Sequence, residues 1–274
     1  MIKIKVICLL LTNAIFASFL AGEIKTPAII GNNMVLQQNH KNPIWGWDTA
    51  GQSVEVIIAG QSHRVKTDKD GYWKITLNPM KASFTPLSMT IKGSSTIEYT
   101  NILVGEVWVC SGQSNMGWSV GKSDDQDLES MSANHPYLRL ISVPNVGTQE
   151  PQDDFDGKWE EATPETAINF SAVGYFFGRR LHQILDVPVG LIDNAWGGSS
   201  CEAWIPRDRL HKLAVAKPYM DQWKTTEETF DFPKLQKGNS PIGPKLREIA
   251  AKTVGFCKTR KRAIQNICIQ FKLS

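Results

Sequence analysis

A serine that follows an apolar strand is the residue whose type and setting best suit covalent chemistry in this chain. Residues 107–110 are typical of an apolar strand, and the small polar run Ser111-Gly112-Gln113-Ser114-Asn115 follows directly. A turn at the end of a strand lifts a hydroxyl out of the sheet and directs free backbone N–H groups at any oxyanion that forms there. This setting favours acyl transfer with Ser114 as the nucleophile. The alternative is a polar loop in which Ser114 caps a helix.

A second segment of this kind lies at residues 189–206. It begins as a short apolar strand, continues into Gly197-Gly198 and ends in an aromatic-rich stretch that contains Trp204. Glycines in such a turn allow backbone to approach a ligand closely. Ligands in open α/β sheets bind at the ends of the strands, so we expect Gly197 and Gly198 to lie at a ligand site.

Both segments resemble a known enzyme family. The runs Glu106-Val-Trp-Val-Cys-Ser-Gly-Gln-Ser-Asn-Met116 and Trp196-Gly-Gly-Ser-Ser-Cys-Glu-Ala-Trp204 resemble blocks of the sialate O-acetylesterase family, a branch of the SGNH-type serine esterases. Upstream, Asn33-Met-Val-Leu-Gln-Gln38 and Pro43-Ile-Trp-Gly-Trp47 are similar to the start of that family's N-terminal β-domain. The resemblance extends from residue 28 to about residue 235.

The resemblance implies roles for particular residues. Ser114 would attack an acetyl ester carbonyl, and its own N–H, with that of Gly197 or Gly198, would stabilise the oxyanion. Asn115, Glu202 and Trp204 would shape the pocket. The alternatives are that Glu202 is a solvated loop acid and that Trp204 is a core aromatic residue. This chemistry requires no metal and no organic cofactor.

The general base that a serine nucleophile needs is harder to find. A serine hydroxyl is activated by a histidine that a carboxylate orients. The family supplies this pair in an Asp-x-x-His-Pro segment near its C-terminus, and another oxyanion donor in a Trp-Tyr-Gln-Gly-Glu-Ser block; neither is found in this sequence. Asp208 and His211 have the Asp-x-x-His spacing, but no proline follows and a helix there would bring the two together for ordinary i,i+3 reasons.

The patterns along the chain divide it into four segments. Strands expected at 54–58, 63–66, 72–77 and 87–91, separated by hairpin-like turns such as Gly60-Gln61, predict a β-sandwich. Beyond residue 104 strands alternate with helices, and Ser171 is expected to cap a helix that runs to about Leu185 with an apolar stripe. We therefore expect a signal peptide at 1–22, an N-terminal β-sandwich domain at 23–103, an incomplete SGNH-hydrolase-like, flavodoxin-like three-layer α/β domain at 104–244, and an atypical basic tail at 245–274.

The first and last segments bear on compartment and completeness. The lysines and apolar run at the N-terminus are typical of a signal peptide, so we expect a secreted or periplasmic protein without stable membrane insertion. Cys110, Cys201, Cys257 and Cys268 would remain, and their pairing is left open. The tail carries a net charge of +7 whereas the whole chain carries +3, which leaves −4 for residues 1–244. This change of sign suggests a truncated, frameshifted or replaced terminus.

The sequence as a whole favours an esterase acting on carbohydrates. We expect a serine carbohydrate esterase that removes O-acetyl groups from sialic acids or related glycans, with activity impaired where the base is missing. One alternative is a non-catalytic glycan-binding module in which Ser114 only lines the pocket. Another is an acetylxylan esterase, which would use the same mechanistic residues. A net charge of +3 gives no support for nucleic-acid binding, and the oligomeric state is left open.

Overall fold

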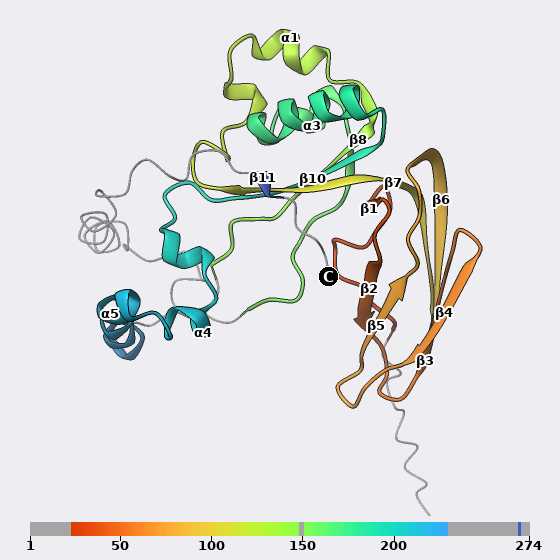
Figure 1. Ribbon diagram of the computed structural model, residues 1–274, viewed down its shortest axis with the longest axis horizontal. Coiled ribbons are helices and arrows are strands. Elements are labelled where there is room, and N and C mark those ends of the chain that lie inside the picture. Colours follow the sequence, from red (N-terminus) through yellow and green to blue (C-terminus); the bar gives the residue numbers. More distant parts are fainter. Residues whose placement is uncertain (1–22, 148–150, 230–267, 270–274) are drawn as a thin grey trace, which may run out of the picture.

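One strand, β7 (Thr96–Gly112), runs through both halves of the structure (Figure 1). The computed structural model describes residues 23–147, 151–229 and 268–269. The predicted signal peptide, and the tail apart from residues 268 and 269, lie outside the described residues. The first half of β7 belongs to a β-sandwich and its second half to a mixed sheet with helices.

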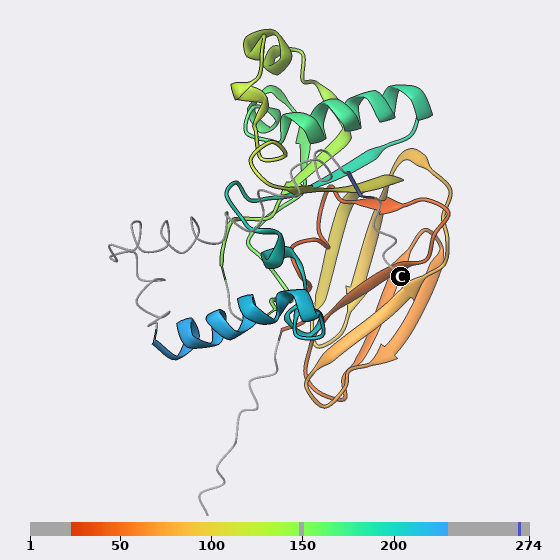
Figure 2. The ribbon, with the colours of Figure 1, turned by 60° about the vertical axis from the view of Figure 1, so that its left-hand side comes forward.

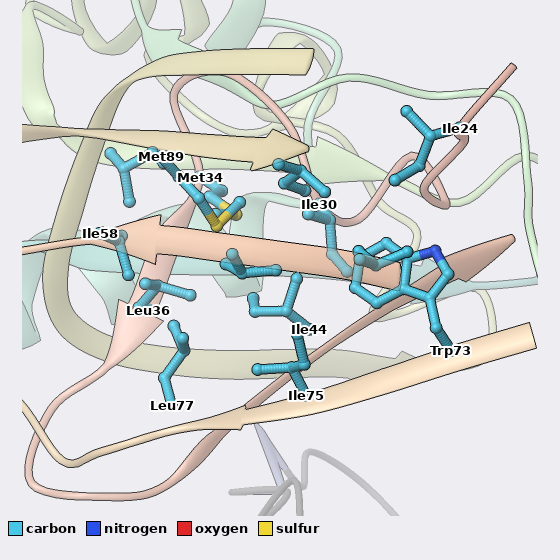
Figure 3. Close-up of a cluster of buried hydrophobic side chains, with 14 of the residues drawn as sticks. Ile24, Ile30, Met34, Leu36, Ile44, Ile58, Trp73, Ile75, Leu77 and Met89 are labelled. Atoms are coloured by element: carbon cyan, nitrogen blue, oxygen red, sulfur yellow. The ribbon is translucent and has the colours of Figure 1, made fainter. Parts of the chain in front are cut away.

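The β-sandwich follows from alternating apolar and polar residues. Its larger sheet has the order β4 (Gln61–Lys66), β3 (Ser53–Ile58), β6 (Ser83–Lys92) and β7, with β1 (Val35–Gln37) also paired to β7. Strands β2 (Asn42–Trp47) and β5 (Tyr72–Leu77) form the facing sheet. Alternate residues of β5 are buried, and Figure 3 shows Trp73, Ile75 and Leu77 directed into the core. The β-sandwich predicted from period-2 alternation is thus present.

The hairpin between β3 and β4 differs by one residue from the predicted turn. Ile58 pairs with Gln61, so the two turn residues are Ala59 and Gly60 rather than Gly60 and Gln61. Both have positive φ, 48° and 74°, as a type I′ hairpin requires. Alanine in the left-handed region gives no sequence signal, which explains the shift.

The second half of β7 forms the mixed sheet. It pairs in parallel with β10 (Val189–Ala195), which pairs in parallel with β8 (His135–Ser142); β9 (Glu160–Ala162) closes that edge in antiparallel. On the other edge of β7, β11 (Cys268–Ile269) pairs in antiparallel with Val109 and Cys110. Helices α1 (Gln126–Met131), α2 (Pro164–Ala167) and α3 (Ala172–Leu185), with the 3₁₀ helix η1 (Val120–Lys122), contribute to the layer above the sheet.

Helix α3 packs on the sheet through small residues. The Ser171 hydroxyl oxygen accepts a 3.0 Å hydrogen bond from the Gly174 N–H, so the predicted cap is confirmed. The predicted apolar stripe is wrong at its end, because Ile184 and Leu185 are 61% and 46% exposed. At Gly178 an added methyl group would lie 2.5 Å from Leu191 of β10. The helix therefore approaches the strands with its small residues, and Figure 2 shows it lying across them on the side away from the sandwich.

The last described helical segments lie apart from α1–α3. They comprise η2 (Cys201–Trp204), α4 (Arg207–Leu210), η3 (Ala214–Ala216) and α5 (Lys217–Thr229). Leu210, Ala216 and Met220 form a small buried cluster of their own. No helix in the described part of the chain is long and apolar enough to cross a membrane.

The two halves meet at a close backbone contact and a buried arginine. A methyl group added at Gly105 would lie 1.9 Å from the Pro188 carbonyl oxygen. Strand β7 can therefore pass Pro188 only because residue 105 is glycine. The arginine is Arg139, which is 2% exposed at its side chain and donates to the Pro136 carbonyl at 2.8 Å and to Asn101 Oδ1 at 3.2 Å. The same guanidinium lies 3.2 Å from the Glu161 carboxylate. Arg139 of β8 thereby links β9 to the sandwich half of β7.

Replacing Arg139 tests this junction. Arg139→Ala leaves the Asn101 and Pro136 oxygens without their donor, and we expect it to lower the free energy of unfolding by about 3 kcal/mol. The exposed pair Arg64–Glu55 offers a matched control, and Arg64→Ala should leave the urea midpoint nearly unchanged. Equal midpoints for the two variants would contradict the assigned role of Arg139.

Candidate active site

Ser114 lies on a turn at the carboxyl end of β7. The turn covers residues 114–117, where the Gly117 N–H donates to the Gln113 carbonyl at 2.9 Å. Ser114 is exposed, whereas Met116 beneath it is 4% exposed. No helix begins at Ser114, since the next helical segment is η1 at Val120. The alternative of Ser114 as a helix cap is therefore wrong.

Gly197 lies directly beside this serine. A methyl group added at Gly197 would be 3.5 Å from both Cα and Cβ of Ser114. Gly198 follows with φ of +81°, a conformation that favours glycine, and an added methyl group there would meet nothing within 4 Å. The structure thus brings together two turns that are 83 residues apart in the printed sequence. An oxyanion formed at the serine is stabilised by backbone N–H groups that lie next to it.

Hydrogen bonds hold the two turns in register. Ala195 of β10 is the partner of Gly112 of β7, and the Trp196 N–H donates to the Gly112 carbonyl at 2.9 Å. The Gln113 amide nitrogen donates to the Ser199 carbonyl at 2.8 Å. We name residues 113–119 the serine loop and residues 196–199 the glycine loop. Gln113 was not singled out by the sequence analysis, although its place next to the serine was a usable signal.

Two tryptophans flank the glycine loop. The Trp204 indole N–H donates to the Ser199 hydroxyl at 2.9 Å, and that hydroxyl donates to the Trp196 carbonyl at 2.7 Å. Trp196 and Trp204 are 39% and 37% exposed, so neither is a core residue. The alternative reading of Trp204 as a core aromatic is therefore not supported. The Trp204 ring, fixed by its indole hydrogen bond, can contact a ligand without first becoming ordered.

The two polar pocket residues predicted from the sequence have different settings. Asn115 is exposed on the serine loop. Glu202 is half-buried in η2. Burial of the Tyr219 phenol in helix α5 raises its pKa, and the negative charge of Glu202 raises that pKa further. The same phenol is hydrogen-bonded with Ser200.

Asp208 and His211 are not joined to the serine. Both belong to the short helix α4 and its C-terminal cap, and both are exposed. Asp208 lies 4.0 Å from Lys212 in an i,i+4 ion pair. Within residues 23–147, 151–229 and 268–269, no hydrogen bond connects His211 with Ser114. Asp208 and His211 are thus arranged as an ordinary i,i+3 pair on a surface helix, the alternative interpretation of their spacing.

An acid that the sequence analysis missed lies behind the site. Asp193 of β10 is a register partner of Cys110 in β7 and Ser142 in β8. Burial raises the pKa of its carboxyl to about 6, although hydrogen bonds from the backbone of Ser171 and Ala195 act in the opposite direction. Its Oδ1 atom is buried without a hydrogen-bond partner. The sequence feature that could have pointed to Asp193 was a single acidic residue at the end of an apolar strand.

Cys110 is buried and Cys201 is exposed, and no disulfide joins them. In the part of the chain that the structure describes, no group of three or more His, Cys, Asp or Glu residues is placed to hold a metal ion.

Comparisons with known proteins agree with this geometry. Residues 104–228 match a family model described as carbohydrate esterase, sialic acid-specific acetylesterase. The curated sialate O-acetylesterase of Mus musculus is 34% identical over 206 residues, which cover 68% of this chain and 38% of that protein. The protein of the same name from Homo sapiens is 34% identical over 209 residues, which cover 69% of this chain and 40% of that protein. The chain thus spans about two fifths of the length of these relatives.

A solved structure is also similar. A carbohydrate acetylesterase from Xanthomonas citri superposes with a TM-score of 0.66 at 34% identity, over 69% of this chain and 44% of that chain. The match confirms the fold class predicted from the sequence, an SGNH-type α/β region preceded by a β-domain.

The pKa of Asp193 predicts how stability depends on pH. The folded protein keeps the Asp193 proton to about pH 6, whereas the ordinary pKa is 3.8. Stability therefore falls as pH rises between these values, and the buried charge costs up to about 3 kcal/mol above them. We expect Asp193→Asn to raise the free energy of unfolding at about pH 7.5 and to have little effect near about pH 4. Urea unfolding at both pH values measures this, with the exposed Asp70→Asn as control; a variant no more stable at the higher pH would contradict it.

Proposed function

We infer from residues 104–228, which belong to the sialic acid-specific acetylesterase family of carbohydrate esterases, that this chain carries the nucleophile of an O-acetylesterase. The observation that carries the proposal is the exposed Ser114 at the end of a central strand, with Gly197 so close that an added methyl group would lie 3.5 Å from it. A nucleophile of this kind acts on an acyl carbon when backbone donors flank it.

The proposed reaction follows ordinary ester chemistry. Ser114 Oγ forms a bond to the carbonyl carbon of the acetyl group, and the carbonyl electron pair moves to its oxygen, beside the backbone of the serine and glycine loops. Collapse breaks the bond to the sugar oxygen, which takes a proton and leaves as a hydroxyl, with acetyl-serine remaining. Water then attacks that ester and releases acetate. A base must accept the serine proton in the first step.

The source of that base sets the expected rate. Among the described residues nothing is hydrogen-bonded to Ser114 that would take its proton. A missing general base typically costs about 10²–10⁴ in rate. We therefore propose that this chain supplies the nucleophile and the backbone around it, and that an added base raises its rate. All five histidines lie among the described residues, and none of them is hydrogen-bonded to Ser114.

The substrate class follows from the rim of the site. Trp196 precedes Gly197 in the glycine loop, and Trp204 is hydrogen-bonded to Ser199 of that loop; both are partly exposed. Asn115, next to Ser114 in the serine loop, adds an exposed polar group. Apolar rings with a few convergent polar groups suit a sugar. The relatives are named sialate O-acetylesterases, which supports an O-acetylated sialic acid as the glycan.

Chemical rescue tests the proposal with the chain as it exists. Acetate release from an O-acetylated sialoside is measured for the 274-residue chain and for Ser114→Ala, each with and without imidazole as an external base. We expect the imidazole-dependent rate of the unaltered chain to exceed that of Ser114→Ala by roughly tenfold or more. Ser132→Ala, an exposed serine of the same domain, is the matched control and should behave like the unaltered chain.

The outcomes separate the alternatives. Equal rates for the unaltered chain and Ser114→Ala under all conditions would exclude Ser114 as the nucleophile. Sialoside binding that persists in both proteins without turnover would support a glycan-binding module. Preferential release of acetate from acetylated xylan would favour an acetylxylan esterase.

A further inference from the structure

An open pocket lies at the carboxyl end of β8. Its volume is about 410 Å³, which is within the range of small-molecule sites. Two of its lining residues, Leu140 and Phe170, are apolar and only 3% and 2% exposed. The polar part of the lining includes Ser142, Asp156, Lys158 and Glu160. Apolar residues combined with a few polar groups are typical of a site for a small ligand.

The pocket lies at the same edge of the mixed sheet as Ser114. Strands β8, β10 and β7 are parallel; Ser142 is in register with Asp193, which is in register with Cys110. Adjacent strands lie about 4.8 Å apart, so the end of β8 is about 10 Å across the sheet from β7. Ser114 follows the carboxyl end of β7. A short oligosaccharide can span the distance between the two strand ends.

The pocket also adjoins the two loops of the candidate site. The segment that leaves β8 reaches the glycine loop, because a methyl group added at Gly147 would lie 3.6 Å from the Trp196 ring. On the helical side, the Phe170 carbonyl accepts a 3.0 Å hydrogen bond from the Val120 N–H. Val120 directly follows the serine loop. Both loops are therefore in contact with segments that border the pocket.

The outer wall of the pocket is held by the β-sandwich. The Asp154 carboxylate accepts a 2.7 Å hydrogen bond from the Ala28 N–H. The Trp159 indole N–H donates to the Ile29 carbonyl at 2.9 Å. The segment 154–159, which supplies the pocket with Asp156 and Lys158, is thus fixed at both ends. A pocket whose wall is already ordered costs little conformational entropy when a ligand binds.

The charges of the pocket favour a neutral ligand that is rich in hydroxyl groups. Lys158 Nζ lies 2.8 Å from the Glu160 carboxylate, so these two charges are paired. Asp156 is exposed, and within the described part of the chain its carboxylate forms no ion pair and accepts no hydrogen bond. A carboxylate accepts hydrogen bonds from hydroxyl groups and repels another carboxylate. An uncharged sugar therefore fits this pocket better than the anionic ring of a sialic acid.

We propose that this pocket is a second sugar subsite, which binds a neutral sugar unit of the same glycan whose acetyl group lies at Ser114. The inference rests on the proposed function in placing the acetyl group at that serine. Asp156 accepts hydrogen bonds from the hydroxyl groups of the neutral unit. The glycan bound in this way extends from Ser114 across the carboxyl ends of β10 and β8.

Residue-specific NMR of the full chain tests the subsite with three sugars: lactose, which is neutral, N-acetylneuraminic acid, which is anionic, and sialyllactose, which contains both units. The backbone amides of Ser142 and Gly157 report on the pocket, and that of Gly197 reports on the glycine loop. We expect lactose to shift the pocket amides more than N-acetylneuraminic acid does at equal concentration. Sialyllactose should shift all three amides with one binding curve.

A pair of aspartate variants tests the role of Asp156. Asp156→Ala removes the unpaired acceptor, and we expect it to raise the Kd for lactose roughly tenfold, because hydrogen bonds to charged groups are among the stronger ones. Asp70→Ala, which removes an exposed aspartate of the sandwich, is the matched control and should leave the Kd unchanged. Both side chains are exposed, so we expect both variants to fold.

Several results would overturn the proposal. Pocket amides that lactose does not shift, or that it shifts equally in Asp156→Ala, would show that no such subsite exists. Larger shifts with N-acetylneuraminic acid would contradict a neutral ligand, and separate binding curves for Gly197 and the pocket amides with sialyllactose would contradict a single glycan. Binding does not depend on turnover, so lactose binding without Ser114-dependent acetate release would contradict the proposed function alone. Acetate release without lactose binding would contradict the subsite alone.

Discussion

The continuity of β7 is the constraint on which the rest of the structure depends. Its first half takes its register from β6 and β1 in the sandwich, and its second half sets the register of β10. A single backbone therefore fixes where the strand ends, and hence where Ser114 stands. The crossing is possible because Gly105 has no side chain to collide with the Pro188 carbonyl. The apolar core of the sandwich thus contributes to the position of a polar residue far from it.

The surroundings of Ser114 combine exposure above with close backbone packing below. The serine itself is held by its neighbours: Gln113 reaches across to Ser199, and Met116 fills the space under the turn. Behind them, Asp193 keeps a carboxyl in a setting that raises its pKa, which lowers stability at neutral pH. Buried ionisable groups with shifted pKa values are common at functional sites, where they lower stability. The site is therefore defined by loop positions as much as by reactive groups.

Sequence reasoning succeeded where a repeating pattern exists. Period-2 alternation located β3, β4, β5 and the second half of β6, and a capping serine located the start of α3. It failed where a single residue, rather than a repeating pattern, determines the local packing. The buried face of α3 consists of Ala172, Gly174, Tyr175 and Gly178, so the apolar stripe did not mark it. Asp193 ends the apolar run of β10, and a single acidic residue has no period that would reveal its partners.

The course of β7 also bears on motion. The predicted boundary between residues 103 and 104 falls inside a hydrogen-bonded strand, and Arg139 bonds across the same junction. Hinges occur at loops or element ends that can absorb a change of backbone angles, and the middle of a paired strand is neither. The sandwich is therefore fixed beside the mixed sheet and does not open and close over the candidate site.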